Sequence, residues 1–298
     1  MEKRQLGKTD MEVSLLGFGG AEIGFEGASA KTVTRLLNSA LDGGLNVIDT
    51  AECYERSEEL IGQAVATRRK EYYLFTKCGH PETLEVEDWR PASLLKSIER
   101  SLRRLRTDHL DVIQLHSCSE DELRQGDVVE ALQRARERGY ARYIGYSGDG
   151  DAARYAVECG QFDTLQISIS IADQEALELV LPLAGERRIG VIAKRPIANA
   201  VWKSKRKPED EYYHVYWDRL RKLEYDFLRA DMKEAVATAL RFTLLVPGVH
   251  TAIVGTAKPG RYAENAALVA AGPLPRQQFD RICARWAEVA DETWGGEI

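Results

Sequence analysis

Residues 72–116 read YYLFTKCGHPETLEVEDWRPASLLKSIERSLRRLRTDHLDVIQLH. The segment begins and ends with an apolar run, Tyr72–Lys77 and Leu110–His116, whose aromatic and β-branched residues favour strands. Between them, Pro91–Leu105 begins with proline and repeats leucine and isoleucine at helical spacing. The order strand, helix, strand predicts two parallel strands joined by a crossover helix.

The same alternation extends along the chain. Six further apolar runs are Leu15–Gly19, Leu45–Asp49, Arg142–Ser147, Thr164–Ser168, Gly190–Ala193 and Thr251–Gly255. Further helical patterns are Lys31–Asp42, Glu58–Thr67, Asp127–Arg138, Ala152–Glu158, Gln174–Leu183 and Met232–Leu244. Apolar strands that alternate with helices are typical of α/β proteins with a parallel sheet covered by helices. Eight units in 298 residues favour a single (β/α)8 TIM barrel over an open doubly wound sheet, so we expect one domain over residues 1–298.

Two segments depart from this alternation. Arg4–Met11, with Gly7 and Asp10, predicts an N-terminal β-hairpin at the bottom of the barrel. Residues 197–230 hold a basic run, an acidic run and several aromatic residues, and we expect them to form a loop insertion at the barrel mouth. The aromatic residues line a pocket wall or belong to the core; they are Trp202, Tyr212, Tyr213, Tyr216 and Trp217.

Composition and charge argue against several classes of protein. The 41 Lys and Arg residues against 47 Asp and Glu give a net charge of −6, which argues against general binding to nucleic acid or to anionic membranes. No apolar run reaches the length of a membrane span, and glycines and Glu22 interrupt the stretch 13–25 that would otherwise resemble a signal peptide. Five scattered cysteines favour reduced thiols in the cytoplasm.

Four chemically active side chains follow three consecutive predicted strands. Asp49, Lys77 and His116 end their strands, and Tyr54 lies five residues beyond Asp49. Each alone is explained by a structural role, such as a helix cap, a surface charge or ring packing. In a barrel, however, all four converge on one mouth, where a lysine is costly to bury unless it is paired. Asp49 is the available partner.

This set of residues suits a proton donor. A tyrosine has a pKa of about 10, too high for efficient proton exchange near neutrality. We expect the ammonium of Lys77 to lower the pKa of Tyr54, with Asp49 holding the ammonium. His116 can hydrogen-bond and orient a substrate oxygen. The set therefore predicts protonation of a carbonyl oxygen while a cofactor supplies a hydride, because no side chain can supply one.

Several motifs also resemble the aldo-keto reductase superfamily, essentially from end to end. They are Gly17-Phe18-Gly19-Gly20, Asp49-Thr50-Ala51 with Cys53-Tyr54, Glu58 and Gly62, then Thr76-Lys77, Leu115-His116 and Ile144-Gly145-Tyr146-Ser147. The resemblance implies an NADP-dependent enzyme that reduces small aldehydes or ketones. It makes Tyr54 the general acid/base, Asp49 and Lys77 its tuning pair, and His116 the group that orients the carbonyl.

The resemblance further implies that NADP(H) lies extended across the barrel mouth without a Rossmann motif. Ser147 and Gln166 would hydrogen-bond the nicotinamide carboxamide, and residues 253–265 resemble the family's adenosine-phosphate loop. A helix N-terminus there would face an anion, and Arg261 can hold a 2′-phosphate bidentately, which favours NADP over NAD. The implied cofactor residues are Gly19, Gly20, Ser147, Gln166, Lys194, Arg195, Gly255, Thr256, Lys258, Arg261, Glu264 and Asn265.

The sequence departs from the family pattern in two places. Many relatives stack an aromatic side chain on the nicotinamide in the segment that matches Ala193-Lys194-Arg195-Pro196. Here either the stacking is lost or Arg195 contributes phosphate contacts instead. Glu55 replaces the small residue that usually follows the catalytic tyrosine.

Three alternatives remain open. Residues 148–153 fit G-x-G-x-x-A, with Asp173 about 20 residues further on, which is the pattern of a Rossmann domain. Cys53, Cys78, His116 and Cys118 fall near predicted strand ends, but no C-x-x-C or H-x-x-x-H spacing supports a metal site, and we expect none. A regulatory subunit that keeps the fold and cofactor with little turnover is the third.

Overall fold

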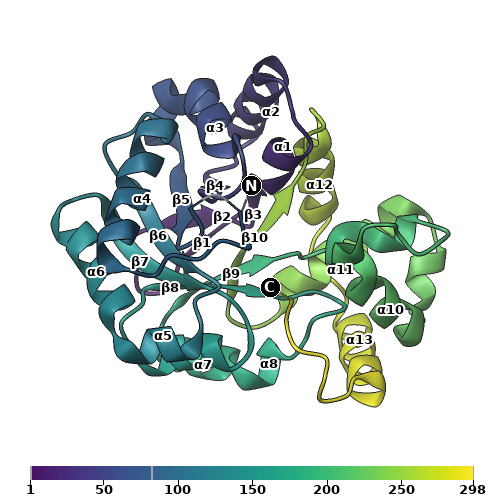
Figure 1. Ribbon diagram of the computed structural model, residues 1–298. Coiled ribbons are helices and arrows are strands. Elements are labelled where there is room, and N and C mark those ends of the chain that lie inside the picture. Colours follow the sequence, from purple (N-terminus) through teal and green to yellow (C-terminus); the bar gives the residue numbers. More distant parts are fainter. Residues whose placement is uncertain (1, 82, 298) are drawn as a thin grey trace.

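The barrel is the central feature of the computed structural model, which describes residues 2–81 and 83–297 (Figure 1). Eight parallel strands close in the order β10-β3-β4-β5-β6-β7-β8-β9. They are β3 (Leu16–Gly19), β4 (Val47–Asp49), β5 (Tyr73–Cys78), β6 (Leu110–His116), β7 (Ala141–Ser147), β8 (Thr164–Ser168), β9 (Gly190–Lys194) and β10 (Val249–Gly255). The predicted (β/α)8 barrel is confirmed, and each predicted strand agrees with the structure to within two residues at either end.

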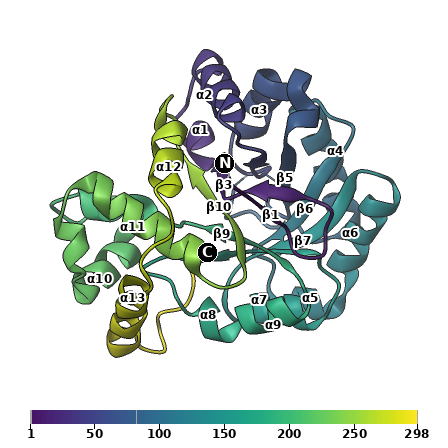
Figure 2. The same cartoon turned by 180° about the vertical axis from the view of Figure 1, so that it is seen from behind.

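Helices surround this barrel on its outer face (Figures 1 and 2). The longer ones are α2 (Ala30–Asp42), α3 (Ser57–Val65), α4 (Pro91–Leu105), α6 (Asp127–Glu137), α7 (Gly150–Glu158), α11 (Met232–Leu245), α12 (Arg261–Ala270) and α13 (Arg276–Val289). Helix α10 (His214–Leu223) is of similar length, and the shorter ones are α1 (Ala21–Phe25), α5 (Glu120–Gln125), α8 (Ala176–Leu179) and α9 (Leu181–Glu186). In residues 2–81 and 83–297, none of them has the length and apolar character needed to cross a membrane.

Local sequence explains where several helices begin and end. The side chain of Ser29 accepts a hydrogen bond from the N–H of Thr32, as expected of a helix cap. The predicted helix Gln174–Leu183 is wrong as one element, because the chain leaves helical geometry at Val180 between α8 and α9. Pro182 explains the break, since it has no N–H and its ring clashes with the carbonyl four residues earlier.

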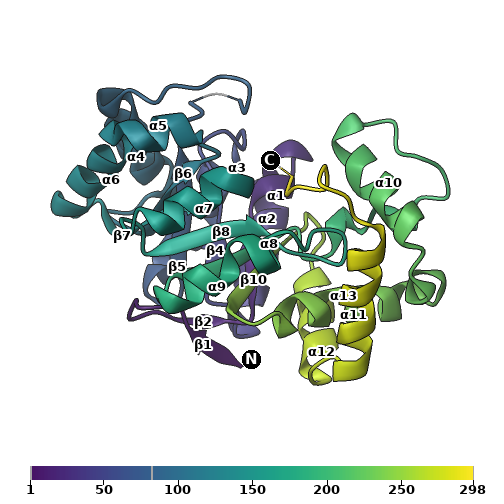
Figure 3. The ribbon, with the colours of Figure 1, turned by 90° about the horizontal axis from the view of Figure 1, so that it is seen from below.

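The N-terminal hairpin closes one end of the barrel. Strands β1 (Lys3–Gln5) and β2 (Glu12–Ser14) pair antiparallel, as predicted. The apolar side chains around them pack against those that point inward from the barrel strands. The resulting cluster, here the barrel floor, consists of Leu6, Met11, Val13, Val47, Phe75, Val112, Ile192 and Ile253. Figure 3 shows the hairpin and the C-terminal segment at opposite ends of the barrel.

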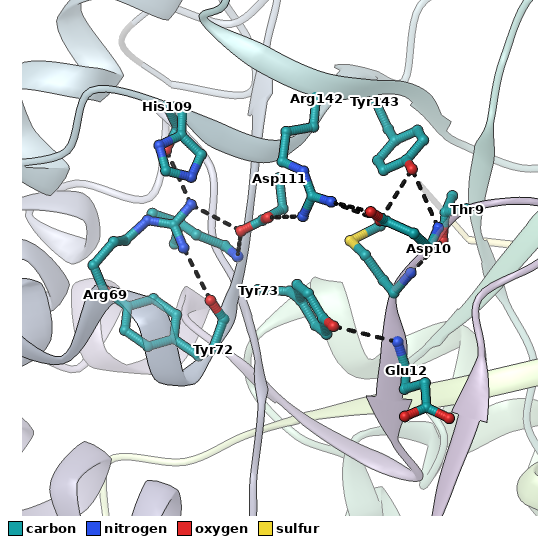
Figure 4. A network of polar contacts seen from close by, with 12 residues as sticks. Thr9, Asp10, Glu12, Arg69, Tyr72, Tyr73, His109, Asp111, Arg142 and Tyr143 are labelled. Atoms are coloured by element: carbon teal, nitrogen blue, oxygen red, sulfur yellow. Dashed lines mark hydrogen bonds and ion pairs between the residues drawn. The ribbon is translucent and has the colours of Figure 1, made fainter.

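A set of ion pairs fastens this hairpin to the strands above it (Figure 4). Arg142 at the start of β7 pairs with Asp10 of the hairpin at 2.6 Å and with Asp111 of β6 at 2.7 Å. Asp111 also pairs with Arg69 at 2.8 Å, and the hydroxyl of Tyr143 donates to Asp10 at 3.0 Å. We call these five residues the bottom network.

The insertion 197–230 is more ordered than the predicted loop. It contains α10 and the 3₁₀ turns η2 (Ala198–Lys203), η3 (Glu211–Tyr213) and η4 (Asp226–Arg229). Tyr216 is buried and donates a hydrogen bond to Asp173 at 2.5 Å, whereas Tyr212 is exposed. The half-buried Trp202, Tyr213 and Trp217 pack against the core. Most of these aromatic residues therefore belong to the core.

Candidate active site

A polar layer lies above the barrel floor. Side chains alternate along a strand, so Val112, Gln114 and His116 of β6 share the inward face, with Val112 in the floor. The register places Lys77 beside Gln114. Asp49, Lys77, Gln114 and Gln166 are all buried. The barrel interior is therefore apolar at the hairpin end and polar toward the mouth.

Lys77 and Asp49 form an ion pair within this layer. Nζ of Lys77 lies 2.6 Å from Oδ2 of Asp49 and donates to the carbonyl of Thr50 at 2.8 Å. The two side chains are only 1% and 2% exposed. Burial raises the pKa of Asp49, and the charge of Lys77 opposes that rise. The contact confirms the predicted pairing of Lys77 with Asp49. The two charges are paired because each would be costly to bury alone.

Tyr54 lies in the turn between β4 and α3, beside this pair. Nζ of Lys77 is 5.1 Å from the centre of the Tyr54 ring. The ring also makes edge contacts with His116 at 5.7 Å and with Phe25 of α1 at 5.6 Å between centroids. Helix α1 can approach because residue 24 is glycine, where a Cβ would lie 2.2 Å from the carbonyl oxygen of Tyr54. The structure thus brings together all four predicted residues.

The prediction that the pKa of Tyr54 is lowered is wrong. Burial raises the pKa of Tyr54 well above its usual value of 10, and the negative charge of Asp49 raises it further. The expectation from the sequence includes the ammonium of Lys77 but leaves out the loss of hydration and the nearby carboxylate of Asp49, both of which raise the pKa. The phenol is therefore protonated at neutral pH, which is the state that a proton donor requires.

His116 is held in its neutral form at the end of β6. Burial lowers its pKa well below 6.5, and the charge of Lys77 lowers it further. Its Nδ1 lies 3.5 Å from Sγ of Cys53, and its backbone carbonyl accepts a hydrogen bond from Nε2 of His80 at 2.7 Å. Its Nε2 forms no hydrogen bond to any residue in the described part of the chain, so this nitrogen can serve a substrate.

Two residues of this region were missed by sequence reasoning. Gln114 could have been found, because it lies two positions before His116 and so shares its face of β6. His80 follows β5 in a loop, and its ring makes edge contacts with His116 and Trp89. No periodic signal marks a loop residue, so only the fold brings His80 to this place.

The residues predicted for the nicotinamide lie next to this set. Ser147 at the end of β7 is the register partner of Gln166 in the middle of β8. The amide of Gln166 donates to Asp49 at 3.4 Å, whereas the Ser147 hydroxyl forms no side-chain hydrogen bond among residues 2–81 and 83–297. Gly19 and Gly20 lie at the end of β3, and a Cβ at residue 20 would lie 2.7 Å from Oγ of Ser57.

Lys194 and Arg195, at the end of β9, are held by the protein itself. Lys194 pairs with Asp149 at 2.7 Å and donates to the carbonyl of Glu297 at 2.9 Å. Burial lowers the pKa of Lys194 to about 8. Arg195 has a left-handed backbone, with φ of 54°, and donates to the hydroxyl of Tyr212 at 3.1 Å and to the Glu297 carbonyl.

The C-terminal segment 294–297 supplies these contacts by crossing the ends of β7, β8 and β9. The carbonyl of Gly295 accepts from Arg219 at 2.6 Å, and the N–H of Gly296 donates to Glu175 at 3.0 Å. A Cβ at Gly296 would lie 2.5 Å from the side chain of Asp149. The segment is therefore fitted closely to the barrel mouth, which sequence analysis did not anticipate.

The predicted adenosine-phosphate loop follows β10. A Cβ at Gly255 would lie 1.5 Å from Oε2 of Glu22, so the glycine admits this carboxylate. Burial raises the pKa of Glu22. Oγ1 of Thr256 accepts from the N–H of Lys258 at 3.0 Å, which shapes the turn before α12.

Three of the predicted residues lie in the first turns of α12. Arg261 and Glu264 form an exposed ion pair at 2.7 Å, one helical turn apart. Asn265 is buried. Arg261 thus has a partner that a bound phosphate would have to replace or share.

Two of the alternatives can be judged from this geometry. The Rossmann interpretation of residues 148–153 is wrong, because the sheet is a closed barrel rather than an open doubly wound sheet. In addition, Asp149 accepts from the N–H of Ser168 at 2.7 Å and pairs with Lys194. In the part of the chain that the structure describes, no three His, Cys, Asp or Glu side chains are placed to hold a metal ion.

Comparison with known proteins identifies the family. The family model described as Aldo/keto reductase family matches residues 15–287. The chain belongs to the aldo/keto reductase family. The uncharacterized oxidoreductase YqkF of Bacillus subtilis (strain 168) is 29% identical to this aldo/keto reductase over 304 residues, covering 95% of each chain. L-galactose dehydrogenase of Arabidopsis thaliana is 28% identical over 287 residues, covering 90% of this chain and 88% of that protein.

A solved structure agrees over nearly the whole length. The holo form of the aldo-keto reductase AKR11C1 from Bacillus halodurans matches this aldo/keto reductase with a TM-score of 0.84 and 28% sequence identity, covering 98% of this chain and 99% of that one. The family places this chain among the oxidoreductases, and aldo/keto reductases bind a nicotinamide cofactor.

Proposed function

We propose that this aldo/keto reductase reduces aldehydes or ketones to alcohols with NADPH, and that Tyr54 donates the proton. The observation that carries the proposal is that Tyr54, His116 and the buried Lys77–Asp49 pair meet at one barrel mouth. They are supplied by three neighbouring strands, whose C-terminal ends form the catalytic face of this fold.

Each of these residues has a distinct task in carbonyl reduction. Neutral His116 donates a hydrogen bond from Nε2 to the carbonyl oxygen and so orients it. Bound NADPH would supply the hydride to the carbonyl carbon. Tyr54 gives its proton to the developing alkoxide, which is a stronger base than a phenolate, so the raised pKa of Tyr54 does not prevent transfer. Lys77 then stabilises the phenolate, while Asp49 holds the ammonium in place.

The polar groups at the mouth fit a nicotinamide cofactor. The Ser147 hydroxyl forms no side-chain hydrogen bond to a described residue and lies beside Gln166, so the two can bind a carboxamide. An anion would be repelled at Gly255 by Glu22, so phosphates would contact Thr256, Lys258 and Arg261 instead.

The experiment is a survey of carbonyl substrates with a matched pair of tyrosine variants. Small, aromatic and sugar aldehydes are tested for NADPH oxidation by the wild type, Tyr54→Phe and Tyr143→Phe. Tyr143 lies in the bottom network, so its variant removes a hydroxyl from the opposite end of the barrel. We expect Tyr54→Phe to lose turnover by about 10²-fold or more while NADPH affinity stays within a few-fold.

Two outcomes would contradict the proposal. Retained turnover in Tyr54→Phe would remove the proton-donor role. Tight NADPH binding without turnover of any aldehyde by the wild type would instead indicate a regulatory subunit of the same fold.

A further inference from the structure

Gln114 occupies the centre of the polar layer. Its side chain is fully buried and points into the barrel from β6, on the same face as His116. The register places it between Lys77 of β5 and Gly145 of β7.

The Gln114 amide connects Asp49 with Gln166. In the proposed reaction, Asp49 belongs to the group that delivers the proton, and Gln166 is expected to hold the nicotinamide. Its Nε2 donates to Oε1 of Gln166 at 2.9 Å and to Oδ1 of Asp49 at 3.3 Å. The amide of Gln166 in turn donates to Oδ2 of Asp49, the oxygen that Lys77 also contacts. Both oxygens of the carboxylate are therefore held, and Oδ1 is held by Gln114.

The neighbouring strand provides the space for this side chain. A Cβ at Gly145 would lie 3.0 Å from Cγ of Gln114 and 2.3 Å from Oγ1 of Thr164. Any larger residue at position 145 would crowd Gln114. The lack of a side chain at Gly145 of β7 thus leaves the space that the Gln114 side chain of β6 occupies.

The oxygen of the Gln114 amide is left unsatisfied by the residues that the structure describes. Oε1 of Gln114 is buried and has no hydrogen-bond partner among residues 2–81 and 83–297. An unpaired buried acceptor costs free energy that an apolar side chain of similar shape would avoid. Turning the amide over would not help, because it would place the carbonyl against the carboxylate of Asp49. The useful part of the Gln114 side chain is therefore its NH₂ group, which donates to Asp49 and Gln166.

We infer that Gln114 is a positioning residue for the proposed reaction, whose single NH₂ group fixes the Asp49 carboxylate and the Gln166 amide relative to each other. The inference rests on the proposed function. Through Asp49 it acts on Lys77 and Tyr54, which deliver the proton. Through Gln166 it acts on the residue expected to hold the nicotinamide carboxamide. Loss of its donor would destabilise the charged carboxylate, so the pKa of Asp49 would rise.

The first experiment measures this effect without requiring turnover. Aspartate labelled with ¹³C at Cγ is followed by NMR during a pH titration of the wild type, Gln114→Met and Thr164→Val, with Asp49→Asn assigning the signal. Thr164→Val is the matched control, because Oγ1 of Thr164 is buried nearby and has no partner in the described residues. We expect the pKa of Asp49 to rise by about 1 in Gln114→Met and to stay unchanged in Thr164→Val. An unchanged value in a folded Gln114→Met variant overturns the inference.

The second experiment uses a variant of the same shape. In Gln114→Glu, a protonated carboxyl can donate to Asp49, whereas an ionised one repels it. We therefore expect kcat for carbonyl reduction to fall about tenfold or more from pH 5.5 to 8 in this variant, while the wild type and Thr164→Val stay level. A level profile in Gln114→Glu contradicts the inference. If the wild type reduces no carbonyl compound, the proposed function fails, and the NMR titration still decides whether Gln114 holds Asp49.

Discussion

The two ends of the barrel use the same residue types in different ways. In the bottom network, Asp111 accepts hydrogen bonds from Arg69, Arg142 and the N–H of Leu74, and Arg142 also reaches Asp10. At the mouth, Nε2 of His116 has no hydrogen-bond partner among the described residues. Both ends pair aspartate with a cation at a strand end, but the bottom network uses its carboxylates and guanidinium groups within the protein, whereas His116 at the mouth keeps a ring nitrogen for a ligand.

The difference between the two ends distinguishes polar groups that stabilise the fold from polar groups that can take part in a reaction. Groups that are fully satisfied within the protein stabilise the fold but have nothing to offer a ligand. Groups left without protein partners cost stability, and they are the ones that can bind or transfer a proton. The barrel therefore has one end fastened by the hairpin, and an opposite end with a polar layer, which we propose is the reactive one.

The largest expected effect comes from Lys77→Met, which tests whether the mouth is the reactive end. The change leaves Asp49 as an unpaired buried carboxylate and removes the charge that stabilises the phenolate. We expect kcat to fall by about 10²–10⁴-fold in steady-state assays of carbonyl reduction. Activity within a few-fold of wild type would show that the pair is only structural.

Arg142→Met tests the opposite end. It removes the link between Asp10 and Asp111, while Arg69 still pairs with Asp111. We expect the free energy of unfolding to fall by about 1–3 kcal/mol in urea titrations, with kcat/KM unchanged within a few-fold. A loss of activity without a loss of stability would break the division between the two ends.

A smaller effect is expected for Arg261→Ala, which sharpens the description of the mouth. If Arg261 exchanges Glu264 for a 2′-phosphate, its loss should raise the Kd of NADPH by about tenfold and leave that of NADH nearly unchanged. Fluorescence titration with both cofactors measures the difference. Equal weakening would mean that Arg261 does not contact the 2′-phosphate.

The smallest effect concerns pH. Because the pKa of Tyr54 is raised and that of His116 is lowered, neither group titrates near neutrality. We expect kcat for reduction to change by less than about twofold between pH 6.5 and 9. A decline centred near pH 7 to 8 would instead indicate a phenol acidified by Lys77.

Stability should depend on pH in a direction set by His116. Its pKa is lower in the folded protein than in the unfolded chain, so the unfolded chain binds more protons at acidic pH. His116 therefore contributes stability that is present above about pH 6.5 and is lost progressively below it. Thermal unfolding of His116→Gln should show a weaker loss of stability than the wild type between pH 6.5 and 5. An identical loss would contradict the lowered pKa.

Much of the fold follows from local patterns. Apolar runs mark the strands, Pro91 marks the first residue of α4, and the order of elements favours the closed barrel. The convergence of Asp49, Lys77 and His116 follows as well, since the ends of parallel strands meet at one rim. The break at Pro182 was missed because helical spacing continued across it.

The amino-acid sequence by itself determined the barrel, the hairpin and the four residues at the mouth. The reason is that the side-chain periodicity of each segment, and the order in which strands and helices follow one another along the chain, are local properties of the sequence. Only the tertiary structure decided that Lys194 and Arg195 are held by the segment 294–297, that Gln114 bridges Asp49 and Gln166, and that Tyr54 stays protonated. These facts depend on burial and on contacts between distant residues. Desolvation and long-range hydrogen bonds are set by the packed three-dimensional surroundings, which no local pattern encodes.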